Sequence, residues 1–311
     1  MNDHRFPFPI PNGWFAVSFS DELAAGELRS LHYFGRDLVL FRGESGEAHL
    51  LDAFCPHLGA HLGVGGVVTG DRVRCPFHAW EWDGASGNCM RIPYAERIPA
   101  AATIESRPVI EVNGYVLAWH HAEGLAPDYT IPQLPEFGND DWTEFEKYEW
   151  VVKTAVQEMG ENGADSAHFQ FVHGTKNVPV TESEENGAFR RMFQPIRMKT
   201  PRGIVEGAID THVHGMGFST TRFTGIAETL EVACTTPIDE ERCHVRYGFT
   251  QPRSLEGGGA AAMIREVVRQ TNEDIPIWEN KIHRARPLLC DSDGPIADYR
   301  RWCRQFYSQP S

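Results

Sequence analysis

Two short stretches, Cys55-Pro56-His57 and Cys75-Pro76-Phe77-His78, determine how this sequence of 311 residues is interpreted. Each stretch provides one cysteine and one histidine within four residues, and 17 residues separate the two. Cysteine thiolates and histidine imidazoles both bind transition metals well. A chain that folds the two stretches side by side therefore gathers four metal ligands at one place.

Two kinds of metal centre use this ligand set. A Rieske [2Fe–2S] cluster has two cysteines on one iron and two histidines on the other. Zinc is the alternative, because two cysteines and two histidines also make a tetrahedral site. Zinc fingers place their histidines on a helix, whereas the residues that follow here, Leu58–Gly63, read as a glycine-containing turn between strands. We therefore predict a [2Fe–2S] cluster bound by Cys55, His57, Cys75 and His78.

The length of the chain and its changing pattern predict two domains. A chain of 311 residues exceeds what one hydrophobic core usually supports. Residues 1–125 contain short β-prone runs separated by glycine and aspartate turns, which predict an antiparallel β domain. Prolines at 127, 132 and 135 then indicate a linker. Residues 126–311 form the second predicted domain.

The second domain is expected to combine a sheet with helices. Long strand-like runs, such as Gly203–His214, fill residues 188–251 and predict an antiparallel sheet. Helix-like patterns occupy residues 155–173, 264–284 and 296–307. The predicted fold class is α+β, with a sheet flanked by helices of the helix-grip type behind an antiparallel β domain.

Charge and cysteine content restrict the partners and the compartment. The formal net charge of −14 disfavours nucleic acid and anionic membranes as partners. No run of 18 apolar residues predicts a membrane span, and the start MNDHRFPFPIPNGWF does not read as a signal peptide. The seven cysteines are odd in number and scattered, as suits a reducing cytoplasm. We therefore expect a cytoplasmic protein.

A second metal site is predicted behind the first domain. His168 and His173 lie close together, and non-haem Fe(II) oxygenases bind iron with two histidines and one carboxylate. In an ideal helix, side chains five residues apart diverge by roughly 140°. The helix must therefore end, bend or bulge between the two histidines, near residues 169–173. Asp165 and His168, three residues apart, are expected to share a helical face.

The third iron ligand must come from another segment. Gln270–Glu279 contains three acidic residues, and we choose Asp274 over Glu273 and Glu279. The short side chain of Asp274 suits a tight ligand, and the nearby Pro276 restricts the chain beside it. Glu279 is expected on a solvated helix face.

The motifs resemble those of a known family. The spacing C-x-H, then C-x-x-H, is similar to that of Rieske proteins. Ala60 and Phe77 stand where respiratory-chain Rieske proteins have two further cysteines, so the chain resembles the oxygenase and ferredoxin branch. The pattern N-x-x-D-x-x-H-x-x-x-x-H from Asn162 to His173 is similar to that of Rieske oxygenase large subunits.

This resemblance implies roles for two further residues and an assembly. Asp165 would bridge a cluster histidine, His78 of the partner subunit, to the iron ligand His168. Asn162 would approach the iron. The resemblance also implies a head-to-tail homotrimer, because the two metal centres of one chain are too far apart to exchange electrons.

Further stretches resemble one subgroup, the 3-ketosteroid 9α-hydroxylases and the Neverland-type cholesterol 7-desaturases. They are Pro11–Phe15, Asp52–Trp80, Ile92–Tyr94 and Asp293–Tyr307. The resemblance implies a monooxygenase component that hydroxylates or desaturates a hydrophobic, steroid-like substrate with O₂. Electrons would come from NAD(P)H through a separate reductase, with or without a ferredoxin, since the chain has no flavin or nicotinamide fingerprint.

Two other functions remain open at this point. A Rieske monooxygenase could act on a small aromatic acid or an O-methyl ether by hydroxylation or O-demethylation. An aromatic acid would require an arginine or a polar cluster in the pocket, whereas a steroid would require a long apolar cavity with a polar end. A pure electron carrier is the other alternative, and intact His168, His173 and Asp274 argue against it.

The cluster assignment predicts the effect of Cys75→Ser. Loss of one thiolate removes a cluster ligand, so the electron paramagnetic resonance signal of the reduced cluster should disappear. Cys89→Ser, which changes a cysteine outside both stretches, serves as the control. An unchanged signal in Cys75→Ser would refute the assignment of this ligand.

Overall fold

The computed structural model describes residues 5–200, 203–256 and 260–308. The chain forms two compact units. One contains Trp14–Asp128, and the other combines Met1–Gly13 with Tyr129–Ser311. Residues 5–13 therefore belong with the C-terminal part of the chain.

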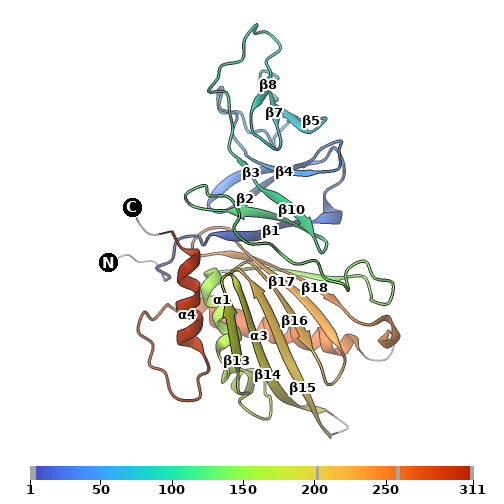
Figure 1. Ribbon diagram of the computed structural model, residues 1–311, viewed down its shortest axis with the longest axis vertical. Helices are drawn as coiled ribbons and strands as arrows, with labels where there is room; N and C mark the ends of the chain where they lie inside the picture. Colours follow the sequence, from blue (N-terminus) through green and yellow to red (C-terminus); the bar gives the residue numbers. More distant parts are fainter. Residues whose placement is uncertain (1–4, 201–202, 257–259, 309–311) are drawn as a thin grey trace. The chain divides into compact units, whose positions relative to one another are not determined.

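The unit Trp14–Asp128 is built from three small sheets, as Figure 1 shows. Their strand orders are β1-β11-β10, β2-β3-β4-β9 and β5-β6-β7-β8, and every strand pair with a described register is antiparallel. The predicted antiparallel β domain is confirmed. The strands are β1 (Gly13–Phe19), β2 (Leu28–Tyr33), β3 (Arg36–Arg42), β4 (Ala48–Asp52), β5 (Val67–Thr69), β6 (Arg72–Arg74), β7 (Glu81–Asp83), β8 (Cys89–Arg91), β9 (Ser106–Arg107), β10 (Val109–Val112) and β11 (Tyr115–His120).

One hydrophobic core in this unit supports both cysteine-containing stretches. Val39, Phe41 and Leu51, from β3 and β4, are fully buried and belong to the same cluster as Cys55 and Cys75. Val73 of β6 belongs to the same cluster, so burial of these side chains fixes both strands that precede the loops, β4 and β6. The loops are therefore carried on a packed base.

The other unit contains a seven-stranded antiparallel sheet with the order β12-β18-β17-β16-β15-β14-β13. The strand predicted at Gly203–His214 is present with those bounds as β15, and it pairs along its whole length with β14. The strands are β12 (Glu146–Val152), β13 (Glu182–Asn186), β14 (Phe189–Thr200), β15 (Gly203–His214), β16 (Phe218–Phe223), β17 (Thr229–Pro237) and β18 (Cys243–Thr250).

Helix α3 (Ala261–Asn280) lies across one face of this sheet (Figure 1). Its buried residues recur every three or four positions, which is the pattern of an amphipathic helix. Met263 and Val267 pack against Phe223 of the sheet, and Asp274 lies on the same buried face. The predicted sheet flanked by helices is confirmed. The remaining α-helices are α1 (Val156–Ala164), α2 (His168–Phe171) and α4 (Ile296–Cys303).

The helix expected over residues 155–173 is interrupted. It ends at Ala164, because Asp165 takes an extended conformation with ψ 101°, and the short α2 follows. The Asp165 carboxylate accepts the backbone N–H groups of Ala167 and His168, which replaces helical bonding by a local turn. The expectation that Asp165 and His168 share a helical face is therefore wrong. The predicted helix end between the two histidines is found at Phe171.

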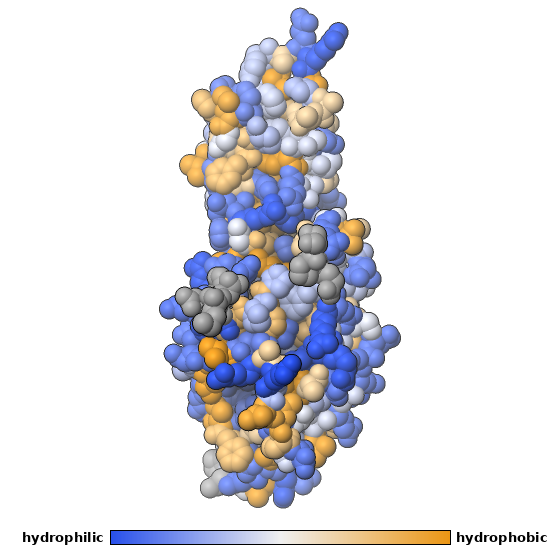
Figure 2. Space-filling model, turned by 90° about the vertical axis from the view of Figure 1, so that its left-hand side faces the viewer, coloured by the Kyte–Doolittle hydropathy of each residue, from blue (hydrophilic) through white to orange (hydrophobic). Residues whose placement is uncertain are grey.

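Two further properties concern the helices and the surface. None of the helices in the described part of the chain is long and apolar enough to span a bilayer. Hydrophilic residues cover much of the face drawn in Figure 2, with smaller hydrophobic areas between them.

Candidate metal centres

The two cysteine-containing loops have matching hydrogen bonds. The backbone N–H of Cys55 donates to the carbonyl of Ala60 at 2.9 Å, and that of Cys75 donates to the carbonyl of Trp80 at 2.8 Å. Each loop therefore closes five residues after its cysteine. The two halves of the site are built alike, although their histidines follow at different spacings.

The four predicted cluster ligands converge at these loops. Cys55 and Cys75 are 2% and 4% exposed, and their thiols contact each other. The ring centroids of His57 and His78 are 4.7 Å apart, and the His57 ring stacks on Trp80. The structure thus brings together two thiols and two imidazoles within one unit.

The surroundings of His78 fit a metal ligand. Its Nδ1 atom is buried and, within the described residues, has no hydrogen-bond partner. A buried nitrogen without a partner costs free energy unless something else binds it. This observation and the two-cysteine, two-histidine donor set fit a Rieske [2Fe–2S] cluster.

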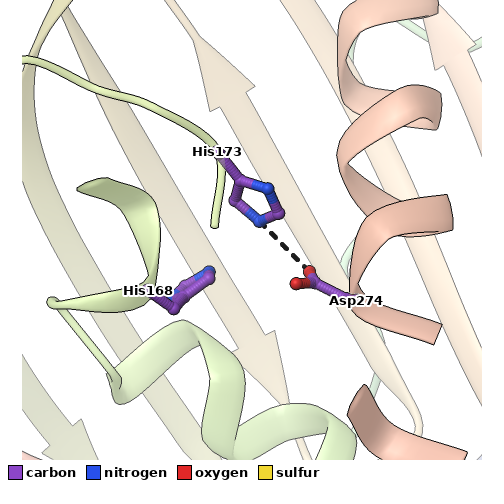
Figure 3. A group of neighbouring side chains, drawn as sticks. All are labelled: His168, His173 and Asp274. Carbon is purple, nitrogen blue, oxygen red and sulfur yellow. Dashed lines mark ion pairs between the residues drawn. The ribbon is translucent and has the colours of Figure 1, made fainter. Parts of the chain in front are cut away.

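The second candidate centre lies in the other unit. His168 begins α2, His173 follows that helix, and Asp274 lies on α3 (Figure 3). The potential ligand atoms of these three residues all lie within 4.8 Å of one another. The structure therefore brings together the two histidines and the carboxylate that the sequence selected from segments far apart in the chain.

His168 is oriented by a backbone hydrogen bond. Its Nδ1 lies 2.5 Å from the carbonyl oxygen of Asp165. A carbonyl can only accept, so Nδ1 carries the proton and Nε2 keeps its lone pair. Burial is the largest influence on His168, and it lowers the pKa of the ring, which favours the neutral form that a metal requires.

His173 is oriented by a carboxylate that sequence analysis rejected as a ligand. Its Nδ1 lies 3.2 Å from Glu273 Oε2, and its Nε2 lies 3.2 Å from Asp274 Oδ2. Arg269 in turn pairs with Glu273. Burial opposes the charged ring, but the hydrogen bonds and charges of Asp274 and Glu273 outweigh it and raise the pKa of His173. A carboxylate on the far nitrogen is the usual support of a ligating histidine.

Asn162 and Asp165 both border this centre. The Asn162 amide nitrogen lies 2.9 Å from Asp274 Oδ2 and 3.2 Å from His168 Nε2, which places it beside two of the three potential ligands. Asp165 contacts the His168 ring through its backbone carbonyl, while its carboxylate binds backbone N–H groups. Glu279, by contrast, accepts the backbone N–H of Lys153.

This donor set fits mononuclear iron. Two histidines and one carboxylate on the same side are typical of non-haem Fe(II) sites that leave coordination positions open. Both far nitrogens are already occupied, so only the near nitrogens face the centre. The residues present can therefore hold the metal that the sequence predicts.

A cavity of about 210 Å³ adjoins this centre. Its wall includes His168, His173 and Asp274 together with inward-facing residues of β14 to β18. Most of the exposed surface of the cavity is apolar, with contributions from residues such as Ile209 and Phe223. The residues that line the pocket could not be predicted from the sequence, because inward-facing positions on a sheet follow from strand register and not from a motif.

The cavity also contains polar side chains that no motif identified. Thr211, Thr221 and Glu231 lie in its wall, but no lysine or arginine does so among the described residues. A signal for Glu231 exists in the sequence, since it is the one charged residue in the buried strand Thr229–Pro237.

Two family models match the chain. The Rieske [2Fe–2S] domain matches residues 13–105, and the 3-ketosteroid 9α-hydroxylase C-terminal domain matches residues 118–307. Together they cover the regions that hold both candidate centres.

Characterised relatives are similar along nearly the whole chain. The oxygenase component of 3-ketosteroid-9-alpha-monooxygenase from Rhodococcus rhodochrous is 32% identical, over 97% of this chain and 81% of that protein. Cholesterol 7-desaturase nvd from Xenopus laevis is 30% identical, over 99% of this chain and 74% of that protein.

Solved structures show the same fold at lower sequence identity. Dicamba monooxygenase bound to dicamba is 20% identical and superimposes with a TM-score of 0.80, over 95% of this chain and 97% of that chain. NdmA of Pseudomonas putida CBB5 with caffeine is 18% identical, with a TM-score of 0.77 over 94% and 89%. With its two matching family models and its relatives at 30% identity or more, this chain belongs to the Rieske non-haem iron monooxygenases, in the family of the 3-ketosteroid 9α-hydroxylases.

Proposed function

We propose that this chain is the oxygenase component that hydroxylates or desaturates a neutral, hydrophobic, steroid-like substrate. The observation that carries the proposal is the cavity beside His168, His173 and Asp274, whose sheet wall is largely apolar. The relatives support it, because their names give a 3-ketosteroid and cholesterol as substrates. Apolar walls with a few polar groups suit a ligand of this class.

The cavity disfavours a small aromatic acid. A buried carboxylate needs a cationic partner, yet neither lysine nor arginine lines the part of the cavity that the structure describes. An O-methyl ether is neutral and remains an outcome of the experiment below.

We assign one metal centre to each predicted domain, residues 1–125 and 126–311. Cys55, His57, Cys75 and His78 would hold the cluster, and His168, His173 and Asp274 would hold the iron. When bound, the cluster supplies single electrons and the iron supplies the position at which O₂ is activated. The chain itself orients the two iron histidines through Asp165 and Glu273 and encloses the substrate between α3 and the sheet.

A homotrimer follows from the same proposal. Asp165 Oδ1 binds the N–H groups of Ala167 and His168, whereas no hydrogen bond from the described residues reaches Oδ2. We place His78 of the partner subunit at this oxygen. Leu58 and Phe77, beside the cluster loops, are 64% and 60% exposed, as side chains that contact a partner would be.

Electrons would arrive from NAD(P)H through a separate reductase, with or without a ferredoxin. The bacterial relative is named an oxygenase component, which implies such a partner. An acidic surface favours a carrier with a basic docking face. The cytoplasmic location stays a prediction from cysteine usage.

The substrate class can be tested with purified protein, a surrogate reductase and O₂. The panel contains 3-ketosteroids, sterols, aromatic acids and aryl methyl ethers, with products identified by mass spectrometry. We expect a steroid to gain one oxygen or to lose two hydrogens, because the cavity is apolar and lacks a cation. Asp274→Ala, which removes a proposed iron ligand, is the inactive control. Turnover of only the aromatic compounds would refute the steroid proposal.

Asp165→Asn tests the proposed bridge between subunits. Asparagine also accepts backbone N–H groups, so the turn before α2 should persist while the negative charge is lost. Loss of a supporting carboxylate typically lowers activity about 10- to 100-fold, and we expect turnover to fall by that factor. Metal analysis should find both centres occupied as in the wild type. Full turnover with full metal content would contradict the bridging role.

Glu273→Ala tests the support of His173. Without the carboxylate on Nδ1, the ring loses its fixed orientation, and the affinity for mononuclear iron should fall by about 10- to 100-fold. Glu279→Ala on the same helix is the matched control, since Glu279 contacts the Lys153 backbone and no iron ligand. Iron is measured after dialysis against a chelator, with cluster absorbance as the reference. Equal iron retention by the two variants would show that Glu273 is dispensable.

A further inference from the structure

A row of polar side chains crosses the inner face of the sheet within the cavity. Thr211 on β15 pairs with Thr221 on β16, which pairs with Glu231 on β17. All three line the cavity that contains the proposed iron ligands. The flanking positions of the same row are apolar, Met192 on one side and Phe249 on the other. We call these three residues the Thr-Thr-Glu row.

Hydrogen bonds connect the members of this row. The hydroxyl oxygens of Thr211 and Thr221 are 3.2 Å apart, and the Thr221 hydroxyl lies close enough to the Glu231 carboxyl to lower its pKa. A protonated carboxyl has one oxygen that accepts and one O–H that donates. If Thr221 donates to the accepting oxygen, the O–H of Glu231 remains available for a group in the cavity. Linked hydrogen bonds of this kind strengthen one another in a low-dielectric site.

Glu231 is an unusual side chain for this position. It is 6% exposed, and within the described residues it forms no ion pair with lysine, arginine or histidine. Burial raises the pKa of its carboxyl to about 8, although the Thr221 hydrogen bond opposes that shift. The carboxyl is therefore mostly neutral at neutral pH. A buried acid without a cation destabilises the fold, so its presence in a cavity wall points to a function.

We propose that Glu231 binds a ketone or hydroxyl oxygen of the substrate through its neutral carboxyl group. This inference rests on the proposed function, because it requires a neutral substrate with an oxygen at one end. The hydrogen bond would fix the substrate along the cavity and so determine which carbon faces His168, His173 and Asp274. The apolar part of the wall contributes affinity but little orientation.

The neutral form of the Glu231 carboxyl also determines which oxygen groups of a substrate it can bind. A ketone oxygen only accepts hydrogen bonds, so an ionised carboxylate could not bind it, whereas the protonated form can donate to it. A hydroxyl can donate or accept, so either form of the carboxyl can bind it. A carboxylate substrate would find neither lysine nor arginine beside Glu231 in the described cavity wall, which disfavours anions. The row therefore selects for a neutral oxygen.

Binding experiments with two substitutions at Glu231 test this role. Glu231→Gln keeps a neutral donor of the same shape, and Glu231→Leu removes it. The probes are a 3-ketosteroid, the matching 3-hydroxysteroid and the steroid hydrocarbon without the 3-oxygen, each titrated into the holoprotein. For both oxygenated probes, Glu231→Leu should bind roughly tenfold more weakly than the wild type, and Glu231→Gln within about threefold of it. The hydrocarbon should bind the wild type and Glu231→Leu alike.

The pH dependence provides a second measurement. Because the pKa of Glu231 is raised to about 8, its carboxyl is neutral below that pH and ionises above it. The wild-type affinity for the 3-ketosteroid should fall as the pH rises past about 8, and that of Glu231→Gln should not. The other titratable groups that line the cavity are His168, His173, Asp274, Tyr247 and Tyr299, and both proteins contain them. A pH effect from those groups would persist in Glu231→Gln.

The outcomes separate this inference from the proposed function. Iron and cluster contents equal to those of the wild type first establish that a variant is folded. If the wild type and Glu231→Leu bind the 3-ketosteroid equally, Glu231 is not the anchor, but the steroid function stands. If the wild type binds no steroid, the substrate class is wrong and a steroid oxygen cannot be the partner of Glu231. If Glu231→Gln shows the same pH profile as the wild type, the role of the neutral carboxyl is overturned.

Discussion

The hydrogen bond from His168 Nδ1 to the backbone carbonyl of Asp165 is the constraint on which the second centre depends. It can form only because the chain leaves the helical conformation at Asp165, which frees that carbonyl from helical bonding. The same turn directs His168 toward Asp274 on α3. Glu273 imposes the matching constraint on His173. Both histidines therefore present Nε2 to one point, and this common orientation suits the three residues to hold a metal.

The sheet supplies the cavity wall that faces the candidate iron ligands. Helix α2, the segment after it and α3 hold the candidate iron ligands, while β14 to β18 supply the opposite wall of the cavity. Packing of Met263 and Val267 against the sheet sets the position of α3 and therefore of Asp274. Substrate shape and metal geometry are thus determined by different layers of one unit. Relatives with different substrates could keep the helices that hold the ligands while the residues on the inner face of the sheet change.

Sequence patterns were most informative where chemistry requires particular residues at short spacing. Cys55 and Cys75 with their histidines, and the pair His168 and His173, were readable because metal ligands repeat in recognisable patterns. Asp274 required a choice among three acids, and its short side chain decided it. Gly203–His214 was readable as a strand because its length and β-prone composition are typical of one.

The sequence was less informative where contacts join residues far apart in the chain, or where local hydrogen bonds compete with helix formation. The break at Asp165 arose from its carboxylate binding two backbone N–H groups, which helix periodicity does not predict. Glu273 was judged only as a ligand, because its contact with His173 joins residues 100 positions apart. The Thr-Thr-Glu row depends on the register of three strands, and register follows from the folded sheet.

The position of Asp274 on α3 has a further consequence for the stability of the fold. A metal held by this residue and by His168 and His173 would tie α3 to the segment after α1, across most of the unit's length in sequence. Such a metal would stabilise the folded state, because the unfolded chain has no preformed site to bind it. Iron would then stabilise the fold as well as take part in the reaction. Its loss would loosen the packing of α3 against the sheet.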